Sequence, residues 1–118
     1  MEIRLTANGK TVTATLIDNA TSRDVRSLLP LTLTLEDYAA TEKIAYLPRK
    51  LSTEGVPPGF DPSVGDVTYY APWGNLAIFH KDAPYAEGLI QLGRIDSGLE
   101  VLSVPGPVRV TIEAVDQR

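Results

Sequence analysis

Apolar and polar side chains alternate along two successive runs at the start of the chain. The apolar members of these runs are Ile3, Leu5, Ala7, Val12, Ala14 and Leu16. A period of two is typical of a β-strand with one buried face. Asn8-Gly9 separates the runs and tolerates the positive φ angles of a type I′ turn. The pattern therefore predicts a β-hairpin over residues 2–17, in which Asn8-Gly9 serves only as the turn.

A different spacing follows the hairpin. Apolar side chains at i, i+3 and i+4 predict a short helix over Thr21–Leu29, which Pro30 ends. Thr21 and Asp24 form a Thr-x-x-Asp capping box, so Thr21 is the predicted N-cap.

Alternating or short apolar runs recur along the rest of the chain. They predict strands over Leu31–Leu35, Val67–Tyr70, Leu76–His80, Leu89–Ile95 and Val108–Val115. A helical turn is predicted over Ser97–Leu102. Many short strands with little helix indicate an antiparallel barrel or sandwich.

Periodicity is lost between Asp37 and Val64, where Pro and Gly are frequent. Tyr, Ile, Leu and Phe side chains interspersed there can anchor the segment to the rest of the protein. We therefore predict an ordered loop region and place the binding surface in it, since long loops in compact domains are usually functional or disordered.

Composition narrows the classes of function. The chain of 118 residues has the size of one domain, and it has no Cys to form a disulfide or a thiolate metal site. A net charge of −4 with scattered basic residues disfavours binding to nucleic acid or to an acidic membrane surface. The alternating N-terminus is neither a signal peptide nor a membrane span. We expect a cytoplasmic protein.

One stretch carries a family resemblance. Leu92–Leu102 resembles the cyclophilin pattern of Phe-Gly-Lys/Arg-Val, two variable residues, Gly-Met/Leu and a β-branched pair. The whole chain, particularly Leu31–Lys50 with Gly65–Lys81, is similar to small bacterial and archaeal cyclophilin-like proteins of unknown function. The resemblance implies that residues 1–118 form one domain. Its fold would be a closed, mainly β, antiparallel barrel of about eight strands with short helices at the ends.

The residues for prolyl isomerisation do not accompany this resemblance. Cyclophilins use an Arg on the strand after the first helix, and Leu31–Leu35 contains none. The Gln-Gly-Gly-Asp element is missing as well. Leu89 stands near the place of the pocket His, and Pro84 or Tyr85 near that of the pocket Trp. The usual isomerase arrangement is therefore not expected.

Aromatic residues gather in Gly65–Lys81. Trp73 lies in a predicted turn between two strands, where it can stack on a ligand or pack over the barrel mouth. Tyr69 and Tyr70 point to opposite faces of their strand, so one belongs to the core and the other can line a groove with Trp73 and Phe79.

Two polar residues complete the candidate site. His80 can line the groove, or it can be a hydrogen-bonded core histidine on the face of Leu76 and Ile78. Arg49 can reach a ligand from the loop, or it can brace the loop in a salt bridge. The sequence presents no catalytic constellation, no metal-ligand set and no cofactor motif.

These observations predict a cyclophilin-like binding module for a small molecule or a peptide segment. Its ligand-binding candidates are Arg49, Tyr70, Trp73, Phe79 and His80. One alternative is a prolyl isomerase in which Arg49 or Arg94 replaces the missing Arg. A second is an interaction scaffold that uses a strand edge or the Pro-rich loop. The sequence assigns neither the ligand nor the oligomeric state.

Overall fold

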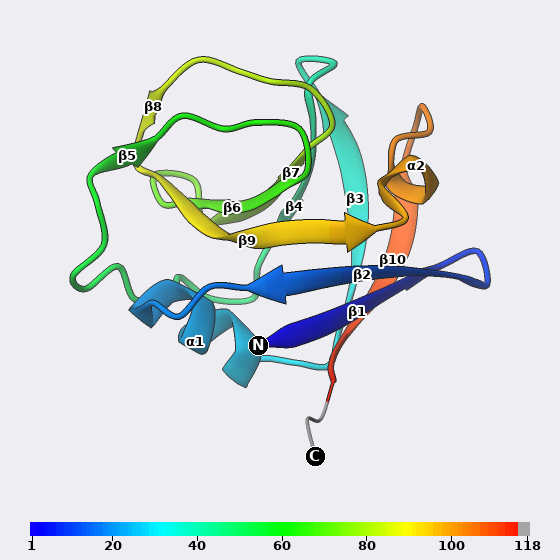
Figure 1. The fold of residues 1–118 in the computed structure, drawn as a ribbon, viewed down its shortest axis with the longest axis horizontal. Coiled ribbons are helices and arrows are strands. Elements are labelled where there is room, and N and C mark those ends of the chain that lie inside the picture. Colours follow the sequence, from blue (N-terminus) through cyan, green and yellow to red (C-terminus); the bar gives the residue numbers. More distant parts are fainter. Residues whose placement is uncertain (116–118) are drawn as a thin grey trace.

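The computed structural model describes residues 1–115, which form one closed barrel with two short helices (Figure 1). The strands are β1 (Glu2–Ala7), β2 (Lys10–Leu16), β3 (Leu31–Tyr38), β4 (Glu42–Tyr46), β5 (Gly59–Phe60), β6 (Asp66–Tyr70), β7 (Asn75–Phe79), β8 (Ala86–Glu87), β9 (Leu89–Ser97) and β10 (Val108–Ala114). The helices are α1 (Ala20–Ser27) and α2 (Leu99–Leu102).

The barrel closes in the order β1-β10-β3-β4-β7-β6-β9-β2, and each neighbouring pair is antiparallel. The fold predicted from the sequence is therefore confirmed. Strands β5 and β8 form a separate two-stranded ribbon. Closure leaves no unpaired edge among the barrel strands, so the scaffold alternative cannot use one of them for strand addition.

The first hairpin forms as predicted. Leu5 of β1 lies opposite Val12 of β2, and both are buried. Asn8 and Gly9 have φ angles of 52° and 73°, as a type I′ turn requires.

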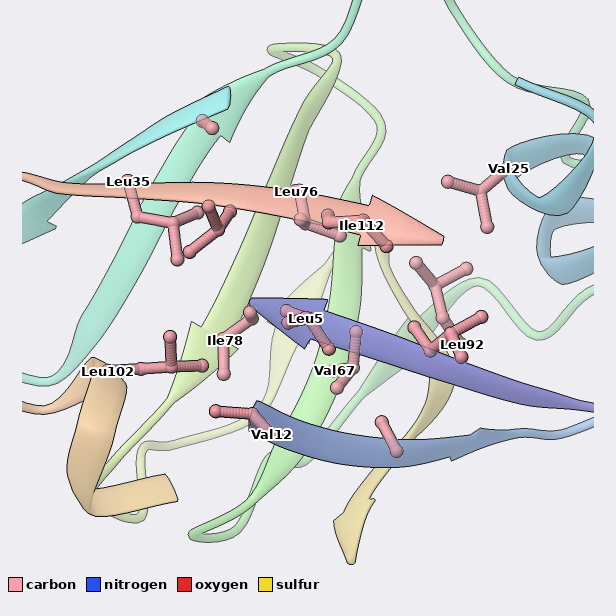
Figure 2. Packing of buried hydrophobic residues seen from close by; sticks show 14 of the residues in the cluster. Leu5, Val12, Val25, Leu35, Val67, Leu76, Ile78, Leu92, Leu102 and Ile112 are labelled. Atoms are coloured by element: carbon pink, nitrogen blue, oxygen red, sulfur yellow. The ribbon is translucent and has the colours of Figure 1, made fainter. Parts of the chain in front are cut away.

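The core lies inside the barrel. Figure 2 shows Leu5 of β1, Leu76 of β7 and Ile112 of β10 among the aliphatic side chains that meet there from different strands. The Tyr69 hydroxyl accepts a hydrogen bond of 3.1 Å from the Leu51 backbone N–H. This contact ties the irregular segment after β4 to the core.

Gly93 of the cyclophilin-like pattern lies where β9 comes very close to its neighbouring strand β2. A Cβ atom at this position would lie 2.1 Å from the Thr15 carbonyl oxygen. Only glycine allows this approach, so the pattern marks a contact that closes the barrel.

The start of α1 differs from the prediction. Asn19, not Thr21, is the N-cap, because its side chain accepts a hydrogen bond of 2.7 Å from the Ser22 backbone N–H. Thr21 is buried, and its hydroxyl donates 2.6 Å to the Ser52 carbonyl oxygen. The capping-box prediction was wrong because this tertiary contact takes up the Thr21 side chain.

The prediction of irregular structure from Asp37 to Val64 was also wrong in part. Strand β3 continues to Tyr38, and residues 42–46 form β4. The usual polarity is reversed in β4, since Lys43 is fully buried while Tyr46 is 62% exposed. Lys43 Nζ donates to Asp37 Oδ1 at 2.8 Å and to the Gly106 carbonyl oxygen, which satisfies the buried ammonium.

The central strands are buried on both faces. All five residues of β7 are buried, although alternate side chains point away from the barrel interior. A second cluster on the outer face contains Ala77, Phe79 and Leu89, with Phe60 and Ala86 of the β5–β8 ribbon packed against it. In Figure 1 this ribbon lies to the left of β6 and β7, and its loops (green to yellow) arch above them. The ribbon therefore covers part of the barrel wall.

Candidate functional site

A pocket of about 210 Å³ lies between the outer face of β4 and β7 and the segment around the β5–β8 ribbon. It is lined by Tyr38, Glu42, Ile44, Pro62, Tyr70, Trp73, Asn75, Phe79, Ala83, Pro84, Ala86 and Leu89. Most of these side chains are apolar or aromatic, as is usual for a small-molecule site.

Strand register sets the floor of the pocket. Glu42 lies opposite Phe79 across the β4–β7 ladder, and Asn75 is four residues before Phe79 on the same strand. With a period of two, these three residues share the outer face, while Lys43 and Ile78 face the interior. The floor therefore has a polar group near each end.

Three aromatic rings form an aromatic rim, consisting of Tyr38, Tyr70 and Trp73. The Trp73 ring lies edge-on to Tyr38, with centroids 5.5 Å apart, and edge-on to Tyr70, at 5.4 Å. Tyr38 is opposite Glu42 in the β3–β4 ladder, and Tyr70 is opposite Asn75 in the β6–β7 ladder. Trp73 thus links the two ends of the pocket.

Glu42 is the acidic residue of the pocket. Its carboxylate is partly buried, and Oε2 accepts a hydrogen bond of 3.0 Å from the Thr41 hydroxyl. Burial raises the pKa of Glu42 above its ordinary value, and the Thr41 hydrogen bond opposes this only in part. Within residues 1–115, no Lys, Arg or His lies within ion-pair distance of this carboxylate. Its charge is therefore uncompensated.

Asn75 carries a buried acceptor. Its side chain is 2% exposed, and Nδ2 donates 3.1 Å to the Leu76 carbonyl oxygen. This bond sets the orientation of the amide, because the reversed amide would bring two oxygens together. Oδ1 has no hydrogen-bond partner among the described residues. Such an orphan acceptor typically costs about 1–3 kcal/mol.

Three of the sequence-predicted candidates lie together. Tyr70, Trp73 and Phe79 all line the pocket, and Tyr69 occupies the core instead. Trp73 is 47% exposed at the rim.

The structure places Arg49 elsewhere. Its guanidinium binds the carboxylate of Asp24 in α1 through two hydrogen bonds, of 2.7 and 3.0 Å. It therefore braces the loop against the helix, which is the structural alternative for this residue, and it does not line the pocket.

His80 is also outside the pocket. Strand β7 ends at Phe79, so His80 lies one residue beyond it, where its backbone N–H donates 3.0 Å to the Thr41 carbonyl oxygen. The imidazole Nε2 of His80 is buried and has no hydrogen-bond partner among the described residues.

The sequence interpretation missed Tyr38, Glu42 and Asn75 as site residues. Tyr38 and Glu42 lay in the segment that was predicted to be irregular, and Asn75 lies just before the predicted strand Leu76–His80. The sequence carried no signal for this strand, because apolar and polar residues do not alternate over residues 42–46.

Two further findings concern metals and membranes. Residues 1–115 contain no group of three His, Asp or Glu side chains that could hold a metal ion. Neither helix in this part of the chain is long and apolar enough to cross a membrane.

Comparison with solved structures gives a protein of similar fold. A hypothetical protein from Archaeoglobus fulgidus, known from a solution structure, has a similar fold with a TM-score of 0.70. The two are 20% identical, and the match covers 96% of this chain and 93% of that one. At this identity the likeness shows the fold alone. A search of curated protein sequences gave no match.

The sequence also matches a family model. That model, of the cyclophilin-like family, matches residues 5–113. The match runs from within β1 to within β10 and confirms the resemblance seen around Gly93. The chain belongs to the cyclophilin-like family.

Proposed function

We propose that this protein binds a small molecule in the pocket between β4, β7 and the β5–β8 ribbon. The aromatic rim over an otherwise mostly apolar pocket carries this proposal. The aromatic rim supplies rigid apolar surface for the same ligand.

The size of the pocket limits the ligand. Drug-sized ligands occupy pockets of roughly 300–1,000 Å³, and this pocket measures about 210 Å³. A compact molecule fits, as does one side chain of a peptide.

Binding is better supported than isomerisation. A prolyl isomerase of this family would direct a guanidinium to the twisted amide. Arg49 is paired with Asp24 instead, and Arg94 donates 2.6 Å to the buried Asp66. Neither of the arginines considered as replacements lines the pocket.

A fragment screen by NMR tests the proposal. Backbone amide spectra of the ¹⁵N-labelled protein would be recorded with a library of neutral, cationic and anionic fragments. Binding is expected to shift the signals of residues 70–79 more than those of β1 and β2. A screen without specific shifts in the pocket would overturn the proposal.

Trp73→Ala is the matching variant. It should abolish the shifts caused by a fragment hit, and it should leave the fold intact because the ring is half exposed. Tyr46→Ala is the control, since Tyr46 is an exposed aromatic residue near the pocket that does not line it. Equal loss of binding in both variants would contradict a specific role for the rim.

A further inference from the structure

Glu42 supplies the charged group that a ligand in the pocket can reach. Its side chain lines the pocket and is partly buried. Oε2 accepts the hydrogen bond from the Thr41 hydroxyl. Oε1 has no hydrogen-bond partner among the described residues, and in contrast to Asn75 Oδ1 it is not sealed from solvent. Oε1 is therefore open to a ligand.

The charge around this carboxylate favours a cationic ligand. Among the described residues, no Lys, Arg or His lines the pocket, and Glu42 is its one acidic residue. The protein as a whole carries a net charge of −4, so its field also attracts cations. Burial raises the pKa of Glu42, because the ionised carboxylate has lost part of its hydration. A bound cation supplies the counter-charge that the fold does not.

The aromatic rim offers ring faces to the same cation. The plane of Trp73 is nearly perpendicular to those of Tyr38 and Tyr70, at 85° and 80°. Two rings in edge-to-face contact present faces that meet in a right-angled corner. A cation over the faces of Trp and Tyr rings is attracted by their quadrupoles. All three rings line the pocket, so a ligand there can contact them.

The carboxylate and the rim are neighbours. Tyr38 lies opposite Glu42 in the β3–β4 ladder. Cβ atoms of opposite residues in an antiparallel pair are about 4.5–5.5 Å apart. One cation can therefore contact both the carboxylate of Glu42 and the rim.

The lining of the pocket discriminates among cations. A primary ammonium has three N–H donors, and each one that is buried without an acceptor is costly. Among the described residues, the pocket offers one charged acceptor, Glu42 Oε1, in a mostly apolar lining. A guanidinium is best bound by both oxygens of a carboxylate, and Thr41 engages Oε2. Methyl groups in place of N–H groups need no acceptors and pack on aromatic faces.

We infer that the pocket takes a methylated ammonium group, with its methyl groups against the aromatic rim and its charge beside the carboxylate of Glu42. This inference rests on the proposed function and specifies its ligand class. The ligand is compact, because the pocket measures about 210 Å³.

Titration with a matched series of compounds, followed by the amide signals of residues 70–79, tests the inference. The series is ethanolamine, N,N-dimethylethanolamine, choline and 3,3-dimethylbutan-1-ol, which has the shape of choline without its charge. Affinity should rise with each stage of methylation. Choline should bind at least about tenfold more tightly than its neutral isostere, because the isostere gains neither the cation–π attraction nor the attraction to Glu42. Equal affinity for these two, or tighter binding of ethanolamine than of choline, would overturn the inference.

A charge variant tests the role of the carboxylate. Glu42→Gln is nearly isosteric and should weaken choline about tenfold while it leaves the neutral isostere unchanged. Glu100→Gln is the control, because it removes the same charge from an exposed residue of α2 outside the pocket. Unchanged choline affinity in Glu42→Gln would overturn the inference.

Two variants of Trp73 test the role of the ring face. Trp73→Phe keeps an aromatic face and should retain most of the choline affinity, whereas Trp73→Leu should lose about tenfold. Tyr46→Leu is the control outside the pocket. If Leu and Phe at position 73 bind choline equally well, the ring face has no role and the inference fails. If Trp73→Leu does not fold, the difference between choline and its isostere in the wild-type protein still tests the inference.

A further arm identifies the source of the methylated group. Nα-acetyl-Nε-trimethyl-lysine methylamide carries the same head group on a peptide. If it binds more tightly than choline, the ligand is a methylated side chain of a peptide; if it binds more weakly, the ligand is a small molecule. Both outcomes support a methylated ammonium ligand.

The failure of this inference can be distinguished from the failure of the proposed function. If no ammonium compound binds while neutral or anionic fragments shift the pocket signals, the ligand class is wrong and small-molecule binding stands. If no compound of any class shifts these signals, both proposals fail.

Discussion

Tyr38 and Trp73 meet edge-on, with ring centroids 5.5 Å apart and an angle of 85° between the ring planes. Tyr38 comes from the end of β3, and Trp73 comes from the turn between β6 and β7. Because Trp73 makes a similar contact with Tyr70, the three rings hold one another in place over the pocket. The rim is therefore a tertiary feature.

Tyr38→Ala should weaken binding of a pocket ligand about three- to tenfold, since an aromatic pair is worth roughly 0.5–1.5 kcal/mol beyond its buried area. Stability should change little, because Tyr38 is 43% exposed. Titration of the variant with a fragment hit measures the effect. Tyr46→Ala should bind like the wild-type protein, and an equal loss in that control would argue against the rim.

Glu42→Gln should raise the free energy of unfolding at neutral pH, by an amount on the order of 1 kcal/mol. Burial raises the pKa of Glu42 in the folded state above 4.5, so the folded protein holds this proton more tightly than the unfolded chain. The charged form therefore destabilises the fold, and wild-type stability falls as pH rises through the raised pKa.

Urea denaturation of wild type and Glu42→Gln across that pH range measures the difference. The two curves should converge at low pH, where Glu42 is protonated. The control Glu36→Gln, at an exposed site, should follow the wild type. A lower stability of Glu42→Gln at neutral pH would contradict this prediction.

Asp24 should make stability depend on pH in acid. Hydrogen bonds from Arg49 and from the Ser52 backbone N–H lower the pKa of Asp24 from 3.8 to about 2. Its contribution is present in full above pH 3.8 and is lost as pH falls to about 2. Asp24→Asn should therefore lose less stability than the wild type over this interval, as measured by denaturation. Asp61→Asn, which changes an exposed carboxylate, should behave like the wild type.

Arg49→Ala separates the two interpretations of this residue. Because Arg49 is paired with Asp24 and does not line the pocket, the variant should lower stability at neutral pH and leave ligand affinity unchanged. Thermal unfolding and titration with a fragment hit measure the two effects. A loss of affinity with unchanged stability would instead support a ligand contact.

The buried Lys43 predicts an asymmetry between two variants. Asp37→Asn leaves an ammonium in the interior without its carboxylate, so it should lower the free energy of unfolding substantially. Lys43→Met removes the buried charge and leaves Asp37 exposed to water, so it should cost about 1 kcal/mol or less. Chemical denaturation of both variants tests this order, and the reverse order would contradict it.

The elements that could be predicted are those in which apolar residues of the sequence become buried and polar residues become exposed. The first hairpin has one buried face and one exposed face, and its alternation is plain in the sequence. Strand β4 lacks such a match, because Lys43 is buried and Tyr46 is exposed. Because of this reversal, residues 42–46 were not predicted to be a strand, and Glu42 was not included in the predicted site.

For the site itself, the aromatic members could be recognised but their partners could not. Tyr70, Trp73 and Phe79 stand close together in one stretch. Glu42 reaches them only because β4 pairs with β7. His80 was included with them as a residue that can line the groove, but it lies one residue beyond the end of β7 and outside the pocket.

The sequence by itself determined the mainly β barrel and its family resemblance, because alternation and turn residues are local requirements and the pattern around Gly93 can be read without the contact that it makes. Only the tertiary structure decided where the pocket lies and which polar groups face it. Barrel closure sets β4 beside β7, and the β5–β8 ribbon buries their outer face. Burial then leaves Asn75 Oδ1 without a donor and Glu42 without a counter-charge, and neither property exists before the chain is folded.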